Sequence, residues 1–207
     1  MQLTHMQRLA VMCYTFAENV TGEQMNHTNG KIAEQSKQKM SQALISVMKQ
    51  YDYKDITVTQ IAQEAQLSRK TFYRLFTDKD AILTLCFDNL FQQAFMRIKS
   101  QNTQHYWEVV QIYFDFWEEQ KDLLYLLQKS NLLHRLFEYS YQHSMEVFEY
   151  IRSKDVAVSF ALPLPYMLAY SVGGMHSMLL KWVENGMDIP SSQLIEKLKA
   201  GFMSGNI

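Results

Sequence analysis

The chain has 207 residues, enough for one large domain or for a small module joined to a larger one, so its core needs no disulfide or metal. Its two cysteines, Cys13 and Cys86, are far apart, which excludes a disulfide framework and offers no metal-ligand spacing, and a reducing compartment fits best. Charged or amide residues interrupt every apolar run well short of the ~20 residues of a membrane-spanning helix. No convincing cleavage site follows the apolar stretch near the N-terminus, so we expect a cytoplasmic protein.

The net charge of -1 hides an uneven distribution along the chain. Residues 37–79 hold eight Lys or Arg against four Asp or Glu, a balance of +4. Residues 80–207 hold ten bases against fourteen acids, a balance of -4, and residues 1–36 supply the remaining -1. A basic segment joined to an acidic body predicts a polyanionic partner for the basic segment alone.

Helical periodicity runs through the whole chain. Apolar residues recur at i, i+3, i+4 and i+7, and there are only three prolines, so the sequence predicts an all-α protein. In the N-terminal extension, residues 1–35, a possible helix over residues 3–18 precedes a polar loop over residues 21–30. Three interpretations stay open: an extra helix packed on the body, a poorly ordered arm, or a natural start at Met25.

Residues 36–80 predict a compact module of three helices. The first helix, over residues 36–51, has one apolar face, made of Met40, Ala43, Leu44, Val47 and Met48. Thr57 is placed to cap a second helix over residues 58–65, with Gln60 as its capping-box partner. Two short helices joined by a tight turn are typical of a helix-turn-helix, and Ser68 offers the cap for the second of them, over residues 69–75.

The helix-turn-helix is expected to bury one set of side chains and expose another. The predicted core contains Val58, Ile61, Ala62, Leu67, Phe72, Leu75 and Phe76. The outward set contains Ser68, Arg69, Lys70, Thr71, Tyr73 and Arg74. Cations, hydroxyls and a phenol in one row suit phosphates and base edges, so the sequence predicts double-stranded DNA as the partner.

Two groups of DNA-binding residues can be distinguished. A helix in the major groove presents its N-terminal residues to the bases, so Arg69 and Lys70 are the first candidates for base contacts and Thr71 is a weaker one. Helix N-termini offer free N–H groups to anions, so Thr57, Thr59, Tyr73 and Lys79 are better placed for phosphates. The Ser68 hydroxyl suits a phosphate or a thymine contact.

The run from Thr57 to Lys79 closely resembles the DNA-binding domain of the TetR/AcrR family of transcriptional regulators. The resemblance covers residues 36–85 and rests on Ile61-Ala62, Ser68-Arg69, Thr71-Phe72-Tyr73, Phe76 and Lys79. It implies a long connecting helix, a variable C-terminal helical domain for ligand binding and dimerisation, and repression that a ligand relieves. The family usually has glycine where this chain has Gln66, so a left-handed turn there would cost on the order of 1 kcal/mol unless the turn differs.

Residues 81–207 are expected to form a C-terminal antiparallel helical bundle. Asp78 is placed to cap the first of the remaining helices, which are predicted over residues 79–100, 103–118, 119–128, 131–152, 164–185 and 190–203. The segment 171–190 resembles the penultimate helix and cap of many TetR-family C-terminal domains, with Gly186 as the C-terminal cap. Gly173-Gly174 inside a helix indicates a close helix contact, either within the monomer or across a two-fold dimer interface formed with the last helix.

The body contains many aromatic residues, and helical spacing favours ordinary core for most of them. The alternative is a ligand pocket, for which the candidates are Trp107, Phe114, Trp117, Phe137, Tyr141, Phe148 and Met175. No metal site is expected. No two of the histidines His105, His134, His143 and His176 are four residues apart, the spacing that would place two metal ligands on one helix face. Glu118 and Glu119 predict a solvated helix end rather than a cation site.

The sequence contains no phosphate-binding glycine loop, nucleophile elbow or metalloprotease helix, so we expect no enzyme, no catalytic residue and no cofactor. The preferred function is a TetR-like regulator, a repressor that binds a pseudo-palindromic operator as a homodimer formed through the C-terminal helices. Its two recognition helices would lie roughly 34 Å apart, and a small-molecule effector would release the DNA. The alternative is a helical interaction protein that has kept the fold without DNA binding or ligand control.

Overall fold

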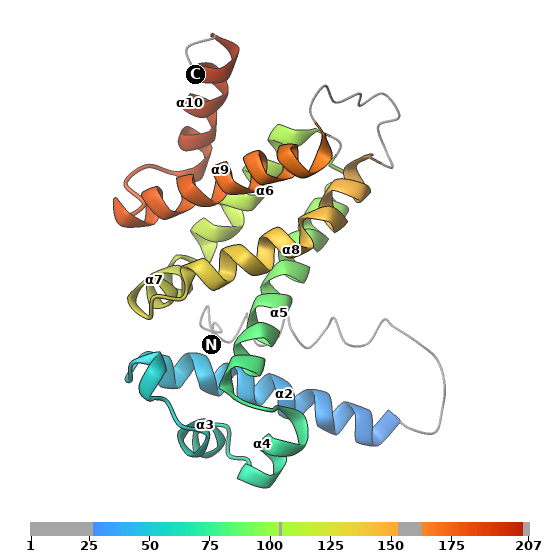
Figure 1. Cartoon of the computed structure of the whole chain (residues 1–207), viewed down its shortest axis with the longest axis vertical. Coiled ribbons are helices and arrows are strands. Elements are labelled where there is room, and N and C mark those ends of the chain that lie inside the picture. The colour runs from blue at the N-terminus through green and yellow to red at the C-terminus, as the bar shows by residue number, and fades with distance from the viewer. Residues whose placement is uncertain (1–26, 104, 153–162, 205–207) are drawn as a thin grey trace, which may run out of the picture. The chain divides into compact units, whose positions relative to one another are not determined.

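The computed structural model describes residues 27–103, 105–152 and 163–204 (Figure 1). Within these ranges the chain is built from α-helices and one short 3-10 helix, without a strand, which confirms the all-α prediction. None of the described helices is long and apolar enough to cross a membrane. The chain divides between Asn89 and Leu90 into two compact units. The helix predicted over residues 3–18, and Cys13 within it, lie outside the described residues.

The first unit is a small helical module in which α3 and α4 pack on α2 (Figure 1). Its elements are α2 (His27–Met48), the 3-10 helix η1 (Tyr53–Asp55), α3 (Val58–Glu64), α4 (Arg69–Leu75) and the first part of α5 (Lys79–Ser100). The apolar face predicted for the first helix is buried, as are Ile61, Ala62, Phe72 and Phe76 of the predicted core. Val58, Leu67 and Leu75 are half-buried. Cys86 is also buried, with its Sγ 2.9 Å from Ser41 Oγ.

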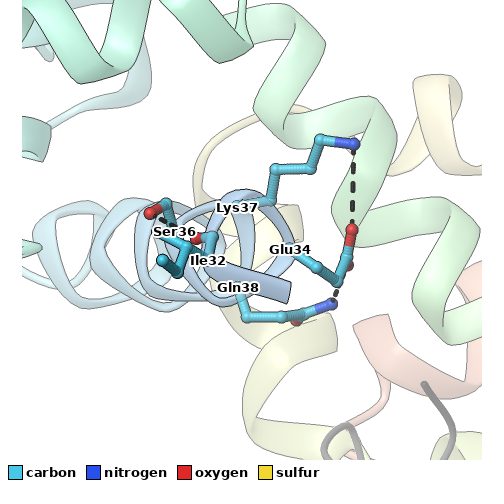
Figure 2. Close-up of polar contacts among 5 residues, drawn as sticks. All are labelled: Ile32, Glu34, Ser36, Lys37 and Gln38. Atoms are coloured by element: carbon cyan, nitrogen blue, oxygen red, sulfur yellow. Dashed lines mark hydrogen bonds and ion pairs between the residues drawn. The ribbon is translucent and has the colours of Figure 1, made fainter. Parts of the chain in front are cut away.

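Helix α2 begins at His27 rather than at residue 36, so it includes residues that the sequence assigned to a polar loop. Figure 2 shows side-chain contacts around the predicted start of this helix. Glu34 accepts a hydrogen bond from Gln38 Nε2 at 3.1 Å and pairs with Lys37 Nζ at 3.8 Å. Ser36 Oγ donates to the Ile32 carbonyl at 2.7 Å, so Ser36 lies inside the helix and does not begin it. Such contacts three and four residues apart stabilise the helix over residues 32–38, ahead of and across its predicted start.

Three predicted N-terminal caps are confirmed. Thr57 Oγ1 accepts from the Gln60 N–H at 3.3 Å while Gln60 Oε1 accepts from the Thr57 N–H at 2.8 Å, which completes the capping box. Ser68 Oγ accepts from the Thr71 N–H at 3.0 Å. Asp78 Oδ1 accepts from the Ala81 N–H at 2.8 Å, at the start of α5. The beginnings of all three helices are therefore determined by local hydrogen bonds.

The turn between α3 and α4 has the left-handed conformation in spite of lacking glycine. Gln66 has a φ of 55°. The Leu67 N–H donates to the Ala62 carbonyl at 2.9 Å and the Gln66 N–H to the Gln63 carbonyl at 3.0 Å, the two bonds of a Schellman motif. Of the two alternatives that the sequence left open, the turn therefore accepts the strain.

The second unit is a helical bundle in which α8 packs along α9 and α10 along α6 (Figure 1). It contains the last part of α5, α6 (Tyr106–Glu119), α7 (Lys121–Lys129), α8 (Leu133–Arg152), α9 (Leu164–Glu184) and α10 (Ser191–Met203). These bounds lie close to the predicted ones. Large side chains such as Phe114, Phe116 and Leu179 are fully buried in its core.

Gly186, which the sequence predicted as the C-terminal cap of the penultimate helix, does end α9. Gly186 has a φ of 76°, its N–H donates to the Val183 carbonyl at 3.0 Å, and the next N–H, that of Met187, donates to the Trp182 carbonyl at 2.7 Å. Trp182 Nε1 donates to the Ile189 carbonyl at 2.9 Å and so holds the loop that follows. This loop leads directly into α10.

Glu118 and Glu119 have partners that the sequence did not predict. Ser191 Oγ lies 2.7 Å from Glu118 Oε2 and 2.6 Å from Asp115 Oδ1, at the first residue of α10. Glu119 accepts from Arg97 at 2.8 Å and 2.5 Å through its two oxygens. The end of α6 is therefore attached to both α10 and the last part of α5, because carboxylates on neighbouring residues point to different helices.

We expect Gln66→Gly to raise the free energy of unfolding by about 1 kcal/mol at most, because glycine adopts the left-handed conformation without steric cost. Urea denaturation of both proteins would measure the change. Gln63→Gly is the matched control: Gln63 is an equally exposed glutamine inside α3, where glycine should cost roughly 1 kcal/mol. Destabilisation of similar size by both substitutions would contradict the strain at Gln66.

Candidate nucleic-acid interface

Helix α4 presents one polar face to solvent. Arg69, Lys70, Tyr73 and Arg74 are exposed, whereas Phe72 is fully buried. The Tyr73 ring meets the Phe72 ring edge-on, with centroids 5.2 Å apart, yet Tyr73 as a whole is 56% exposed. The buried phenylalanine therefore determines which way the exposed side chains point.

The cations of this face carry no counter-charge within the part of the chain that the structure describes. The side chains of Arg69, Lys70 and Arg74 form neither a hydrogen bond nor an ion pair with any described residue. A phosphate or a base edge would therefore not have to displace an internal partner. Cations in this state suit a polyanion.

The hydroxyl groups of the predicted interface lie at the N-termini of the two short helices. Thr57, Thr59 and Ser68 are exposed, and Thr71 is half-buried. Thr57 and Ser68 use their side-chain oxygens in the caps described above, and Ser68 Oγ also lies 3.0 Å from Thr71 Oγ1. These residues consequently shape the ends of α3 and α4 at the surface that carries the cations.

Lys79 lies differently from the other predicted DNA-binding residues. Its Nζ donates to the carbonyls of Tyr53, Lys54 and Ile56 at 2.6, 2.9 and 3.0 Å. The ammonium also lies 4.8 Å from the centroid of the Tyr53 ring. The side chain is half-buried in the first unit and faces the protein's own backbone.

The seven residues predicted for a ligand pocket differ in their surroundings. Phe114 and Trp117 are buried, Tyr141 is exposed, and Trp107, Phe137, Phe148 and Met175 are half-buried. Phe114 packs against the Trp182 ring at 5.8 Å, and Phe137 stacks on His176 at 4.4 Å. For Phe114 the ordinary interpretation as core therefore fits better than a ligand contact.

Sequence reasoning missed two groups of buried polar side chains in the body, the pair Trp117 and Tyr113 and a single histidine. Trp117 Nε1 is buried without a well-formed hydrogen bond to any described residue. Beside it, burial raises the pKa of the Tyr113 phenol far above its ordinary value, and the Trp117 side chain partly offsets that rise. The i, i+4 spacing of this pair was the available signal.

His176 is the second such group. Burial lowers the pKa of His176 to about 4, so its stacked ring is neutral at pH 7. Among the described residues there is no group of three or more His, Cys, Asp or Glu arranged to hold a metal ion.

Comparison with known families assigns both units. A family model described as bacterial regulatory proteins, tetR family, matches residues 42–86. A second model, described as a transcriptional regulator C-terminal region, matches residues 104–202. The comparison with curated proteins found no match. Members of the family bind DNA, are usually dimers and are generally not enzymes, and the two matched regions show that the chain belongs to the TetR family of transcriptional regulators.

Proposed function

We propose that the protein is a repressor that binds a pseudo-palindromic operator as a homodimer and leaves the DNA when a small molecule binds its C-terminal unit. The observation that supports DNA binding most strongly is the exposed face of α4, where Arg69, Lys70 and Arg74 have no partner among the described residues. The +4 balance of residues 37–79 adds a field that attracts phosphates. Such a regulator would work in the cytoplasm, where bacterial DNA lies.

Within this proposal the two ends of α4 have different tasks. Arg69 and Lys70 lie in its first turn, and a recognition helix presents that turn to base edges in the major groove. A guanidinium can bind the O6 and N7 atoms of guanine with two hydrogen bonds, which makes Arg69 the main determinant of sequence. Tyr73 lies further along the helix and its hydroxyl suits a phosphate.

The hydroxyl-bearing residues Thr57, Thr59, Ser68 and Thr71 complete the proposed contact surface. Three of them are exposed, and they lie at the helix ends whose N–H groups and dipoles favour anions. Thr71 is half-buried and close to Ser68, so its contribution to base contacts is the smallest. Lys79 is not included, because its donors already serve backbone carbonyls.

Dimerisation is supported by an exposed face on α9. Tyr166 and Tyr170 are 67% and 68% exposed and lie four residues apart, with Gly174 four residues further on the same face. A Cβ built on Gly173 or Gly174 meets no described atom within 4 Å. The close backbone contact that this glycine pair indicates is thus absent from the described monomer, and a second copy would supply it.

The last helix also has exposed apolar side chains. Met203 is 79% exposed on α10, and Phe202 is also exposed, although its ring meets Trp107 at 5.6 Å. Exposed aromatic and methionine side chains are enriched in the cores of protein interfaces. A dimer formed through α9 and α10 would set the separation of the two recognition helices, which a palindromic site requires to be roughly 34 Å.

Effector binding is supported by the Trp117 indole. The buried Trp117 N–H has only a poorly aligned contact with the Tyr113 side chain, and a ligand with a better placed acceptor atom would form a stronger hydrogen bond with it. The aromatic side chains nearby suit a flat, apolar compound. Binding releases DNA only if the compound has a higher affinity for the conformation that does not fit the operator.

The DNA-binding prediction compares two substitutions on α4. Arg69→Ala should reduce discrimination between operator and altered sites by ~1 to 3 kcal/mol, whereas Tyr73→Ala should weaken binding to all sequences alike. Selection of bound genomic fragments, followed by titrations at two salt concentrations, would measure both effects. Lys121→Ala, an exposed lysine on α7, is the control. Absence of any enriched inverted repeat would favour the interaction protein instead.

The dimer prediction concerns Gly174. Gly174→Arg should convert the dimer to monomers, because a long charged side chain then occupies the position of close contact. Sedimentation equilibrium would report the mass of each protein. Gln142→Arg, on an exposed position of α8, should leave the dimer unchanged. A Gly174→Arg protein that stays dimeric would exclude α9 as the centre of the interface.

The effector prediction compares two indoles. Trp182→Phe removes a well-formed hydrogen bond and should lower stability by about 1 kcal/mol more than Trp117→Phe, which removes a donor whose contact with Tyr113 has poor geometry. Thermal denaturation with a library of aromatic acceptor compounds would then identify ligands. Trp117→Phe should weaken their binding roughly tenfold. Ligands that bind both variants equally well would show that Trp117 Nε1 is not a contact.

A further inference from the structure

The short helix η1 ends just before α3, and its end is held by a residue from another part of the chain. The last carbonyls of a helix have no partner within the helix and carry a partial negative charge. In η1 the Lys54 carbonyl is in this position and that of Ile56 follows, whereas the Tyr53 carbonyl also accepts from the Ile56 N–H at 3.3 Å. All three accept hydrogen bonds from Lys79 Nζ, at 2.6, 2.9 and 3.0 Å.

These contacts use the whole donor capacity of the lysine. An ammonium has three N–H groups, and each of them has a carbonyl within hydrogen-bonding distance. The Tyr53 ring lies beside the same ammonium at 4.8 Å, where its π face adds attraction. A phosphate could reach Lys79 only by displacing these partners.

The neighbouring residue strengthens the same attachment. The Tyr53 hydroxyl donates to Asp80 Oδ1 at 2.5 Å, and the Tyr53 side chain is buried. Consecutive residues of the first turn of α5 thus hold both the backbone and the side chain of Tyr53. The first turn of α5 and the residues that lead into α3 are joined on two sides.

The position of Lys79 within its own helix points the same way. Lys79 is the first residue of α5, where the positive end of the helix dipole disfavours a cation. A lysine at that position is stabilised by the negative end of η1 instead. Its placement is therefore accounted for by the contact with η1, without any need for DNA.

We propose that Lys79 is a positioning residue for DNA binding, which acts by capping η1 and so fixing the start of α3, and that it is not a phosphate contact. The proposal rests on the proposed DNA-binding function. Thr57, the cap of α3, directly follows Ile56, whose carbonyl Lys79 holds. Loosening this attachment displaces α3, and with it α4, which packs on α3.

The decisive variant is Lys79→Arg, which keeps the charge but cannot direct three N–H groups from one nitrogen at three carbonyls. A phosphate contact would tolerate arginine well. We expect Lys79→Arg to bind the operator roughly tenfold more weakly than the unmodified protein, with an unchanged slope of log K against log salt. Operator affinity equal to that of the unmodified protein would overturn the proposal.

Two further variants test the attachment from other sides. Tyr53→Phe removes the bond to Asp80 without altering any charge, so it should weaken operator binding with the slope unchanged. Lys79→Met should do the same, whereas Arg74→Met, which removes an exposed cation of α4, should reduce the slope by about 1 per protomer. A reduction of that size for Lys79→Met would identify a phosphate contact and contradict the proposal.

A readout without DNA separates this proposal from the proposed function. In the free protein, Lys79→Arg and Tyr53→Phe should speed hydrogen exchange of the backbone amides of residues 56–61, because the cap on η1 is weaker. Unchanged exchange in both variants would overturn the proposal even if DNA binding is confirmed. Faster exchange in a protein that selects no DNA would support the cap while the proposed function fails.

Discussion

The burial of Phe72 and Ile61 is the contact on which the DNA-binding unit depends. Helices α3 and α4 have seven residues each, and isolated helices of that length do not persist in water. Both side chains are fully buried in a core to which α2 contributes Met40 and Leu44. Packing therefore makes these helices stable, and the N-terminal caps decide where they begin. The exposed face of α4 follows, since a short helix with one side buried has only one orientation left.

Polar contacts between elements then hold the module in shape. Ser46 Oγ donates to Glu64 Oε1 at 2.6 Å and joins α2 to α3, while Lys79 and Asp80 join the start of α5 to η1. Each of these bonds connects residues far apart in sequence. None of these bonds involves a cation of α4. The positive charges of α4 are therefore not paired within the described chain and can bind a polyanion.

Helix α5 contributes to both units, which gives the proposed regulation a physical basis. Its first residue, Lys79, holds the carbonyls before α3, and near its other end Ile98 packs with Val109 and Ile112 of α6. Arg97 pairs with Glu119 at the end of the same α6. In the proposed regulation, a ligand that altered the packing of α6 would act on the same helix that carries Lys79.

The sequence by itself determined the all-α class, the helix-turn-helix, its caps and the outward face of α4, because periodicity and capping are local properties. It also identified Gln66 as a strained position, since only the backbone conformation of one turn was involved. Tertiary structure alone decided the attachment of Lys79 to η1, the burial of the Trp117 indole beside Tyr113 and the lack of described atoms close to Gly174. Each of these features depends on which atoms lie opposite a side chain. The packing of segments far apart in the sequence determines those atoms, and the periodicity of the sequence carries no information about that packing.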